Sequence, residues 1–179
     1  MEERVLPPGE PPSKPGAAFR PGTYMVQPNS PTFFIEHFVL SNMNDHLRNH
    51  FPKYDIVLKT KNPDSGIGID YSSGGSASLS FKQQKMATGN PQVLDQGVKE
   101  TKGFRLVLVG PNAVLPSEVQ KSIKDRASIS LFLSINVPVK MKIGVLKTWT
   151  IDMDISCNLK VNTLAKNTKI LSQECHTMI

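Results

Sequence analysis

A chain of 179 residues, 39% hydrophobic and 20% charged, has the size and composition of one globular domain with a tail, which excludes a wholly disordered protein. Its longest apolar run, Leu106–Val109, is much shorter than the roughly 18 residues of a membrane-spanning helix, and no signal-peptide pattern opens the chain. The net charge of +6 indicates an anionic partner or, more simply, a solvated lysine face. Aromatic residues do not interleave with the lysines as they do in a nucleic-acid groove.

The first 31 residues are dominated by proline, since eight of the 14 prolines lie there. Proline fixes φ and removes a backbone donor, so this stretch is not expected to form the interior of a helix or a sheet. The sequence therefore predicts a disordered, partly polyproline II tail over residues 1–31 and a folded domain over residues 32–179.

From Thr32 onward, short apolar runs alternate with turn residues such as Asn62-Pro63 and Gly110-Pro111. Repeated short strands at this spacing predict an all-β fold, an antiparallel Ig- or fibronectin-like sandwich of about seven or eight strands. In chain order, the predicted strands are Phe33–Leu40, Tyr54–Thr60, Gly66–Tyr71, Ala77–Phe81, Phe104–Val109, Ser128–Val139, Trp149–Val161 and Ile170–Thr177.

The clearest alternation runs from Trp149 to Val161, where every odd-numbered residue is apolar and every even-numbered residue is polar. A strict period of two is the mark of a strand with one buried face, so Trp149 and Ile151 are expected to pack in the core. The strand Ser128–Val139 repeats the pattern. Pro138 predicts an edge, bulge or bend there, because proline lacks the donor of a strand ladder.

One short helix is predicted between these strands. The segment Pro116-Ser117-Glu118 opens it, and Val119, Ile123 and Ala127 follow at fourfold spacing. Ser117 is the expected N-cap, because its hydroxyl can accept a hydrogen bond from a free N–H group of the first turn.

The two cysteines take opposed positions if the last two strands form a hairpin that turns at Lys166. Cys157 then faces Cys175, and Leu159 faces Gln173. Opposed Cα atoms in antiparallel strands lie roughly 4.5–5.5 Å apart, within the range of a disulfide. A disulfide between Cys157 and Cys175 is one candidate and a pair of buried thiols is the other, with the redox compartment deciding between them.

Few residue combinations point to catalysis or metal binding. His46 and His50 lie one helical turn apart, but two imidazoles lack the third ligand that a metal site needs. Asp152 and Asp154 share the polar face of one strand, where a solvated, salt-bridged pair is expected rather than acid–base catalysis. The chain contains neither a nucleophile elbow nor a phosphate-binding glycine loop. The sequence therefore predicts no enzymatic activity, no metal and no cofactor.

Nine segments, taken in order, resemble one protein family. They are Arg4–Pro7, Pro21–Gln27, Pro31–Ile35, Leu58–Pro63, Leu115–Ser117, Val137–Lys140, Leu146–Trp149, Ser156–Val161 and Ser172–Cys175. Their order and spacing resemble the plant late embryogenesis abundant subgroup 2, harpin-induced-like (non-race-specific disease resistance-like) family over nearly the whole chain. Members of this type normally carry a membrane helix between tail and domain, whereas here Gln27 runs almost directly into the segment Pro28-Asn29-Ser30-Pro31. A splice form, a gene-model error and a soluble paralogue are the three hypotheses for this difference.

The resemblance implies a non-enzymatic, membrane-associated interaction or signalling protein of plant defence and stress, located at the plasma membrane. The expected partners are proteins or an anionic membrane surface, with Lys140, Lys142 and Lys147 as the candidate basic contact face. Neither nucleic acid nor a small-molecule ligand is expected. The alternative is a soluble, cytoplasmic, stress-protective protein that shields apolar surfaces during dehydration. A carrier with an apolar cavity between its sheets is a third hypothesis.

Overall fold

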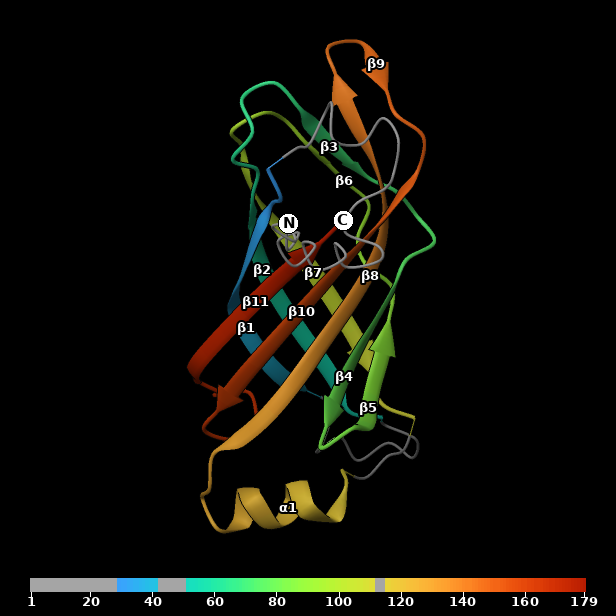
Figure 1. The fold of residues 1–179 in the computed structure, drawn as a ribbon. Helices are drawn as coiled ribbons and strands as arrows, with labels where there is room; N and C mark the ends of the chain where they lie inside the picture. The colour runs from blue at the N-terminus through green and yellow to red at the C-terminus, as the bar shows by residue number, and fades with distance from the viewer. Residues whose placement is uncertain (1–28, 42–50, 112–114) are drawn as a thin grey trace, which may run out of the picture.

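The computed structural model describes residues 29–41, 51–111 and 115–179, and this part is mostly antiparallel strand with one helix (Figure 1). The prediction of an all-β fold with one short helix is confirmed. The elements are β1 (Thr32–Ser41), β2 (Lys53–Lys61), β3 (Gly68–Tyr71), β4 (Ser76–Phe81), β5 (Gln84–Gly89), β6 (Leu94–Gln96), β7 (Thr101–Val109), α1 (Ser117–Lys124), β8 (Ile129–Ile143), β9 (Leu146–Lys147), β10 (Ile151–Val161) and β11 (Ile170–Met178).

Three short strands were not expected from the sequence. Strand β5 buries two adjacent residues, Met86 and Ala87, because a register shift lies opposite Leu79 and Ser80, so it shows no alternation. Strands β6 and β9 have three and two residues, which is too short for a period of two to be visible.

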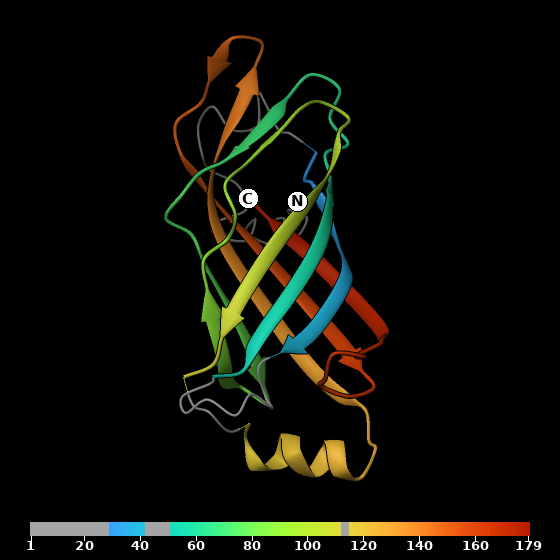
Figure 2. The ribbon, with the colours of Figure 1, turned by 180° about the vertical axis from the view of Figure 1, so that it is seen from behind.

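All strands belong to one sheet, whose order is β1-β2-β7-β5-β4-β8-β10-β11, with β3 and β9 paired to β8 and β6 paired to β3. Strands β1, β2 and β7 form one wall, and β8, β10 and β11 form the facing wall (Figures 1 and 2). The two layers of the expected sandwich are therefore parts of one curved sheet. Its weakest junction joins β5 to β7 through a single residue pair, Thr88 and Val109.

The sheet is nearly closed, because its two edge strands β1 and β11 meet along a seam. The backbone N–H of Ile35 donates to Oε1 of Gln173 at 2.7 Å, and Nε2 of Gln173 donates to the carbonyl of Ile35 at 2.8 Å. At the far end of β1, the N–H of Leu40 donates to the carbonyl of Ala165 at 3.0 Å. A side-chain amide thus takes the place of a backbone partner between two edge strands.

The core lies between the two walls and follows the period of two. Every odd-numbered residue of β8 from Ile129 to Met141 is buried, as is every odd-numbered residue of β10 from Met153 to Val161. At one end of the core the ring of Phe33 contacts Tyr71 and Phe104 edge-on, with ring centroids 6.4 and 6.0 Å apart. Burial of apolar side chains on this scale is the main favourable contribution to folding.

Strand β8 continues through Pro138 without a register shift against β10, so the expected bulge is absent, but on its other side the strand has a local edge at this residue. Pro138 pairs with Asp152 of β10, and on its other side its carbonyl accepts a hydrogen bond from the N–H of Ser72 at 2.8 Å. The interruption lies in the neighbouring strands instead, because β3 ends opposite Val139 and β4 begins opposite Asn136. The missing N–H of proline faces this gap, where no ladder donor is required.

Helix α1 lies across one end of the sheet (Figure 1), where it buries Val119. The prediction that Ser117 is the N-cap is wrong. The helix already begins at Ser117, and the N-cap is Pro116, whose extended backbone carries no side-chain cap. The helix also ends earlier than expected, at Lys124, because Arg126 has a φ of +55°. Ala127 is therefore exposed and does not extend the buried face.

A buried polar network lies at the opposite end of the sheet. The hydroxyl of Tyr71 donates to Oε1 of Gln96 at 2.9 Å and lies 3.3 Å from Oγ1 of Thr60. The amide of Gln96 donates in turn to the carbonyls of Thr60 and Glu100. Burial raises the pKa of Tyr71 to about 12, so the hydroxyl stays protonated. The network fixes the loop after β6 to the end of β2, because each buried polar group has a partner.

Asn62, in the Asn-Pro step that follows β2, connects the same loops. Its side-chain N–H groups donate to the carbonyl of Ile67 at 2.8 Å and to the carbonyl of Gly97 at 3.0 Å. Its side-chain oxygen accepts from the N–H of Asp64 at 3.1 Å. The fully buried amide therefore satisfies three backbone groups that no strand partner reaches.

Strands β10 and β11 pair in the expected register at the cysteines. Cys157 lies opposite Cys175 with a Cα–Cα distance of 4.0 Å, and a disulfide joins them. Leu159 lies opposite Gln173 as expected, but a bulge then places Val161 opposite Ile170. The disulfide ties β11, an edge strand, to its neighbour β10.

Two buried tyrosines provide a matched test of the polar network. Tyr71→Phe removes the hydroxyl that Gln96 and Thr60 share, and we expect the free energy of unfolding to fall by about 1–3 kcal/mol. The hydroxyl of Tyr54 is buried with no partner among the described residues, so Tyr54→Phe should leave stability unchanged or raise it. Urea unfolding of both variants measures this difference. An equal loss in the two variants would contradict the assigned role of the network.

The disulfide provides a second test. Cys157 and Cys175 lie 18 residues apart, and a bridge that closes a loop of this length stabilises a domain by about 3 kcal/mol. We expect reductant to lower the free energy of unfolding by about this amount in the unmodified protein. The double variant Cys157→Ala and Cys175→Ala should be less stable from the start and insensitive to reductant. A reductant effect of equal size in the double variant would show that the loss has another origin.

Candidate functional site

The three lysines of the candidate basic face lie together at one end of the molecule. Lys140 and Lys142 are on the last part of β8, and Lys147 on β9 lies directly opposite Lys142. This end, which we call the β9 end, also carries β3 and β6, and it lies opposite to α1 (Figure 1). Residues from four strands therefore contribute to one surface.

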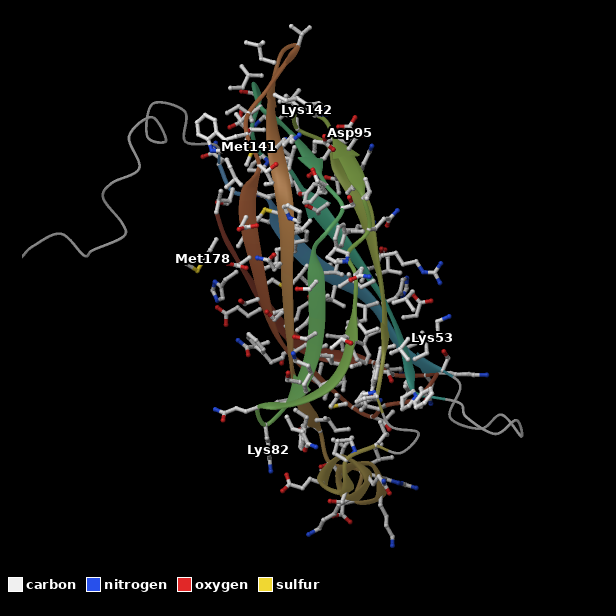
Figure 3. The ribbon with its side chains drawn as sticks, turned by 90° about the vertical axis from the view of Figure 1, so that its right-hand side faces the viewer. Lys53, Lys82, Asp95, Met141, Lys142 and Met178 are labelled. Carbon is white, nitrogen blue, oxygen red and sulfur yellow. A yellow bond between two sulfur atoms is a disulfide. The ribbon has the colours of Figure 1, made fainter. Side chains whose placement is uncertain are left out.

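Two of the three lysines are engaged by carboxylates. Lys142 forms an ion pair with Asp95 on β6, and Nζ of Lys147 lies 3.0 Å from Asp70 on β3. The side chains of Lys142 and Asp95 lie together near the β9 end, whereas Lys82 lies at the far end close to α1 (Figure 3). The hydrogen bond from Lys142 holds the pKa of Asp95 below its usual value. The basic face is therefore partly neutralised.

The positive charge that is not paired at the β9 end belongs to Lys140 and to lysines on other strands. Lys140 makes no ion pair within the described residues, and neither does Lys61, which ends β2. Lys102 on β7 donates to the backbone carbonyl of Asp95 and lies 3.8 Å from Glu100. Sequence reasoning found the lysine cluster but missed Asp70 and Asp95, because strands β3 and β6 are far from β8 in the chain.

An exposed apolar tip projects beyond these charges. Strand β8 ends at Ile143, a turn follows, and β9 returns at Leu146. The exposed fraction is 99% at Val145, 70% at Leu146 and 68% at Trp149. We call Ile143, Val145, Leu146 and Trp149 the β9 tip. Exposed apolar side chains gathered on one hairpin and just after it make this tip a candidate contact surface.

The prediction that Trp149 packs in the core is wrong. Trp149 precedes β10, which begins at Ile151, and only from Met153 onward are the odd-numbered residues fully buried. The chain at this point crosses from β9 to β10 without a strand partner. Thr148 holds the crossing in place, because its N–H donates to the carbonyl of Met141 and its hydroxyl accepts from the N–H of Met141, both at 2.9 Å.

The two carboxylates that the sequence analysis considered for acid–base catalysis lie in solvated positions. Asp152 and Asp154 are exposed on β10, and Asp154 accepts a hydrogen bond from Nδ2 of Asn136 at 2.8 Å. His46 and His50 lie outside the described residues. Within the residues that the structure describes, His, Cys, Asp and Glu side chains form no group of three that could hold a metal ion.

A second surface feature follows the seam between β1 and β11. An open groove of about 600 Å³ is lined by residues 34–39 of β1 and by residues 168–173 before and within β11. Phe34 and Leu171 are exposed beside it. The side chain of Gln173 crosses the groove to reach Ile35 and so occupies the place where a further strand would pair.

Two comparisons with known proteins point to one family. The family model described as late embryogenesis abundant protein matches residues 57–157, which is more than half of the chain. NDR1/HIN1-like protein 6 of Arabidopsis thaliana is 25% identical over 162 residues, which cover 85% of this chain. The chain spans 63% of the length of that relative.

Among solved structures, a protein from Archaeoglobus fulgidus aligns with 85% of this chain and 98% of its own, at 11% identity and a TM-score of 0.38. In the parts of the chain that the structure describes, no helix has both the length and the apolar character needed to cross a membrane. On the family model and the Arabidopsis relative together, the chain belongs to the late embryogenesis abundant subgroup 2, harpin-induced-like family.

Proposed function

We propose that this protein is a non-enzymatic, membrane-associated interaction protein that acts in plant stress and defence. Membership of the family and the NDR1/HIN1-like relative support a role in stress or defence. Membrane association is our proposal, and one observation carries it. Lysines and exposed apolar side chains lie together at the β9 end, and this combination suits an anionic membrane surface.

The positive charge supports the same partner. The chain has a net charge of +6, and Lys61 and Lys140 at the β9 end have no carboxylate partner among the described residues. A lysine close to an anionic leaflet contributes about 1 kcal/mol to binding. A few lysines therefore produce weak, salt-sensitive association, and tighter binding requires apolar contact as well.

Two carboxylates of the described region whose pKa is lowered have structural partners. Asp55 forms a two-point ion pair with Arg105, which holds the pKa of Asp55 below its usual value. Asp64 accepts hydrogen bonds from the N–H groups of Gly66 and Ile67 and so shapes a turn. These carboxylates stabilise the fold, and we assign none of them a chemical step.

Fractionation of plant cells that express the full chain tests the proposal. We expect the protein in the membrane pellet and, because charge contributes, a partial release by a high-salt wash. The variant Lys61→Glu and Lys140→Glu reverses two lysines that make no ion pair, so it should move protein into the soluble fraction. Because Asp70 lies opposite Lys140, urea unfolding checks that this variant remains folded. Lys121→Glu and Lys124→Glu on α1 make the same change in net charge at the far end and should have little effect.

Two outcomes would contradict the proposal. If the unmodified protein lies in the soluble fraction before and during stress, the soluble stress-protective alternative replaces membrane association. If the α1 variant is released as readily as the variant at the β9 end, net charge and not this surface determines the distribution.

A further inference from the structure

The β9 tip is a closed hairpin that carries its apolar side chains on a convex surface. Lys142 pairs with Lys147 and Ile143 with Leu146, so the strand backbone next to the turn is hydrogen-bonded internally. Gly144 takes the first turn position with a φ of +61°, a conformation that residues other than glycine rarely adopt. Val145 follows at the outermost point. The tip can therefore enter a less polar medium while most of its backbone groups keep their partners.

The exposure of the tip follows from the length of β8. The odd-numbered residues of β8 up to Met141 are buried against the facing wall, but Ile143 has the same parity and is exposed. Strand β3 pairs with β8 only as far as Lys142, and β9 alone accompanies it further. The hairpin thus extends past the end of the core, where its apolar side chains have no intramolecular partner among the described residues.

We propose that the β9 tip inserts into the interfacial layer of a bilayer that contains anionic lipid, with Val145 and Leu146 among the upper acyl chains and Trp149 at the headgroups. This inference rests on the proposed membrane association and identifies the residues that make the contact. Tryptophan favours the membrane–water interface, because its ring is largely apolar while its N–H can reach a polar partner.

The shape and the charges of the β9 end favour a bilayer over a protein partner. A convex, isolated tip fits a medium that deforms around it, whereas a protein partner would need a concave surface shaped to receive it. Lys140, Lys142 and Lys147 lie on the strands just behind the tip, at the level where lipid phosphates would lie if the tip were inserted. In this orientation of the protein, the apolar tip and the lysines contact the membrane at the same time. The partly neutralised lysines alone, or the small tip alone, would not fix the orientation.

The tip carries its own spectroscopic probe, because Trp149 is the single tryptophan of the chain. The first experiment adds vesicles of phosphatidylcholine, with and without phosphatidylserine, to the full-length protein. We expect the emission of Trp149 to shift to the blue, to become protected from acrylamide, and to be quenched by lipids brominated on their acyl chains. Vesicles that contain phosphatidylserine should give the larger change.

Substitutions at the tip complete the test. Val145→Asp together with Leu146→Asp should weaken vesicle binding by at least about tenfold, because two apolar side chains lose their burial in the membrane. The matched control replaces the same residue types at exposed positions away from the β9 end, Val109→Asp together with Leu171→Asp, and should bind like the unmodified protein. All four side chains are exposed, so unfolding midpoints should stay unchanged in both variants.

Each contrary result has a distinct meaning. Sedimentation with vesicles while the emission of Trp149 stays unchanged would overturn tip insertion and leave the proposed membrane association intact. A blue shift that grows with protein concentration in the absence of vesicles would assign the tip to a second copy of the chain. Equal loss of vesicle binding in the tip variant and the control variant would also overturn the assignment. Absence of vesicle binding by a protein that fractionates with cell membranes would overturn it too.

Discussion

The structure depends on one long strand that is paired along both of its edges. β8 pairs with β10 and then β9 along one edge, and with β4 and then β3 along the other. Its inward side chains from Ile129 to Met141 form one wall of the core. Pro138 fits this strand because its missing donor faces the gap between β3 and β4. The same strand extends past the core at its C-terminal end, so the element that organises the fold also presents the tip.

The β9 end is held firmly behind this tip. Asn62 and Gln96 are fully buried, and their amides bind the carbonyls of the surrounding loops. Ion pairs connect β8 to β6 and β9 to β3. Exposed ion pairs contribute little stability individually, so their more important effect is on the surface charge. They neutralise part of the lysine cluster, and the surface that remains combines a modest positive charge with a small apolar projection.

The seam shows how an antiparallel sheet can nearly close without a complete ladder. Edge strands present free backbone groups, which favour pairing with other chains. Here Gln173 satisfies both backbone groups of Ile35, and the Cys157–Cys175 disulfide holds β11 against β10. The neighbouring groove stays open, but the position of a further strand is already taken at Ile35. Closure of the seam therefore limits edge pairing and leaves the β9 end as the more distinctive candidate contact surface.

The sequence by itself determined the all-β class, the inward faces of β8 and β10, and the register that sets Cys157 opposite Cys175, because the period of two is a local property of each strand. It also located three of the lysines of the β9 end, Lys140, Lys142 and Lys147. Only the tertiary structure decided that Trp149 and Ile143 are exposed, since parity says which way a side chain points but not whether another strand lies across from it. Likewise Asp70, Asp95 and Gln173 acquire their partners from strands distant in the chain, so no local pattern could reveal the ion pairs or the seam.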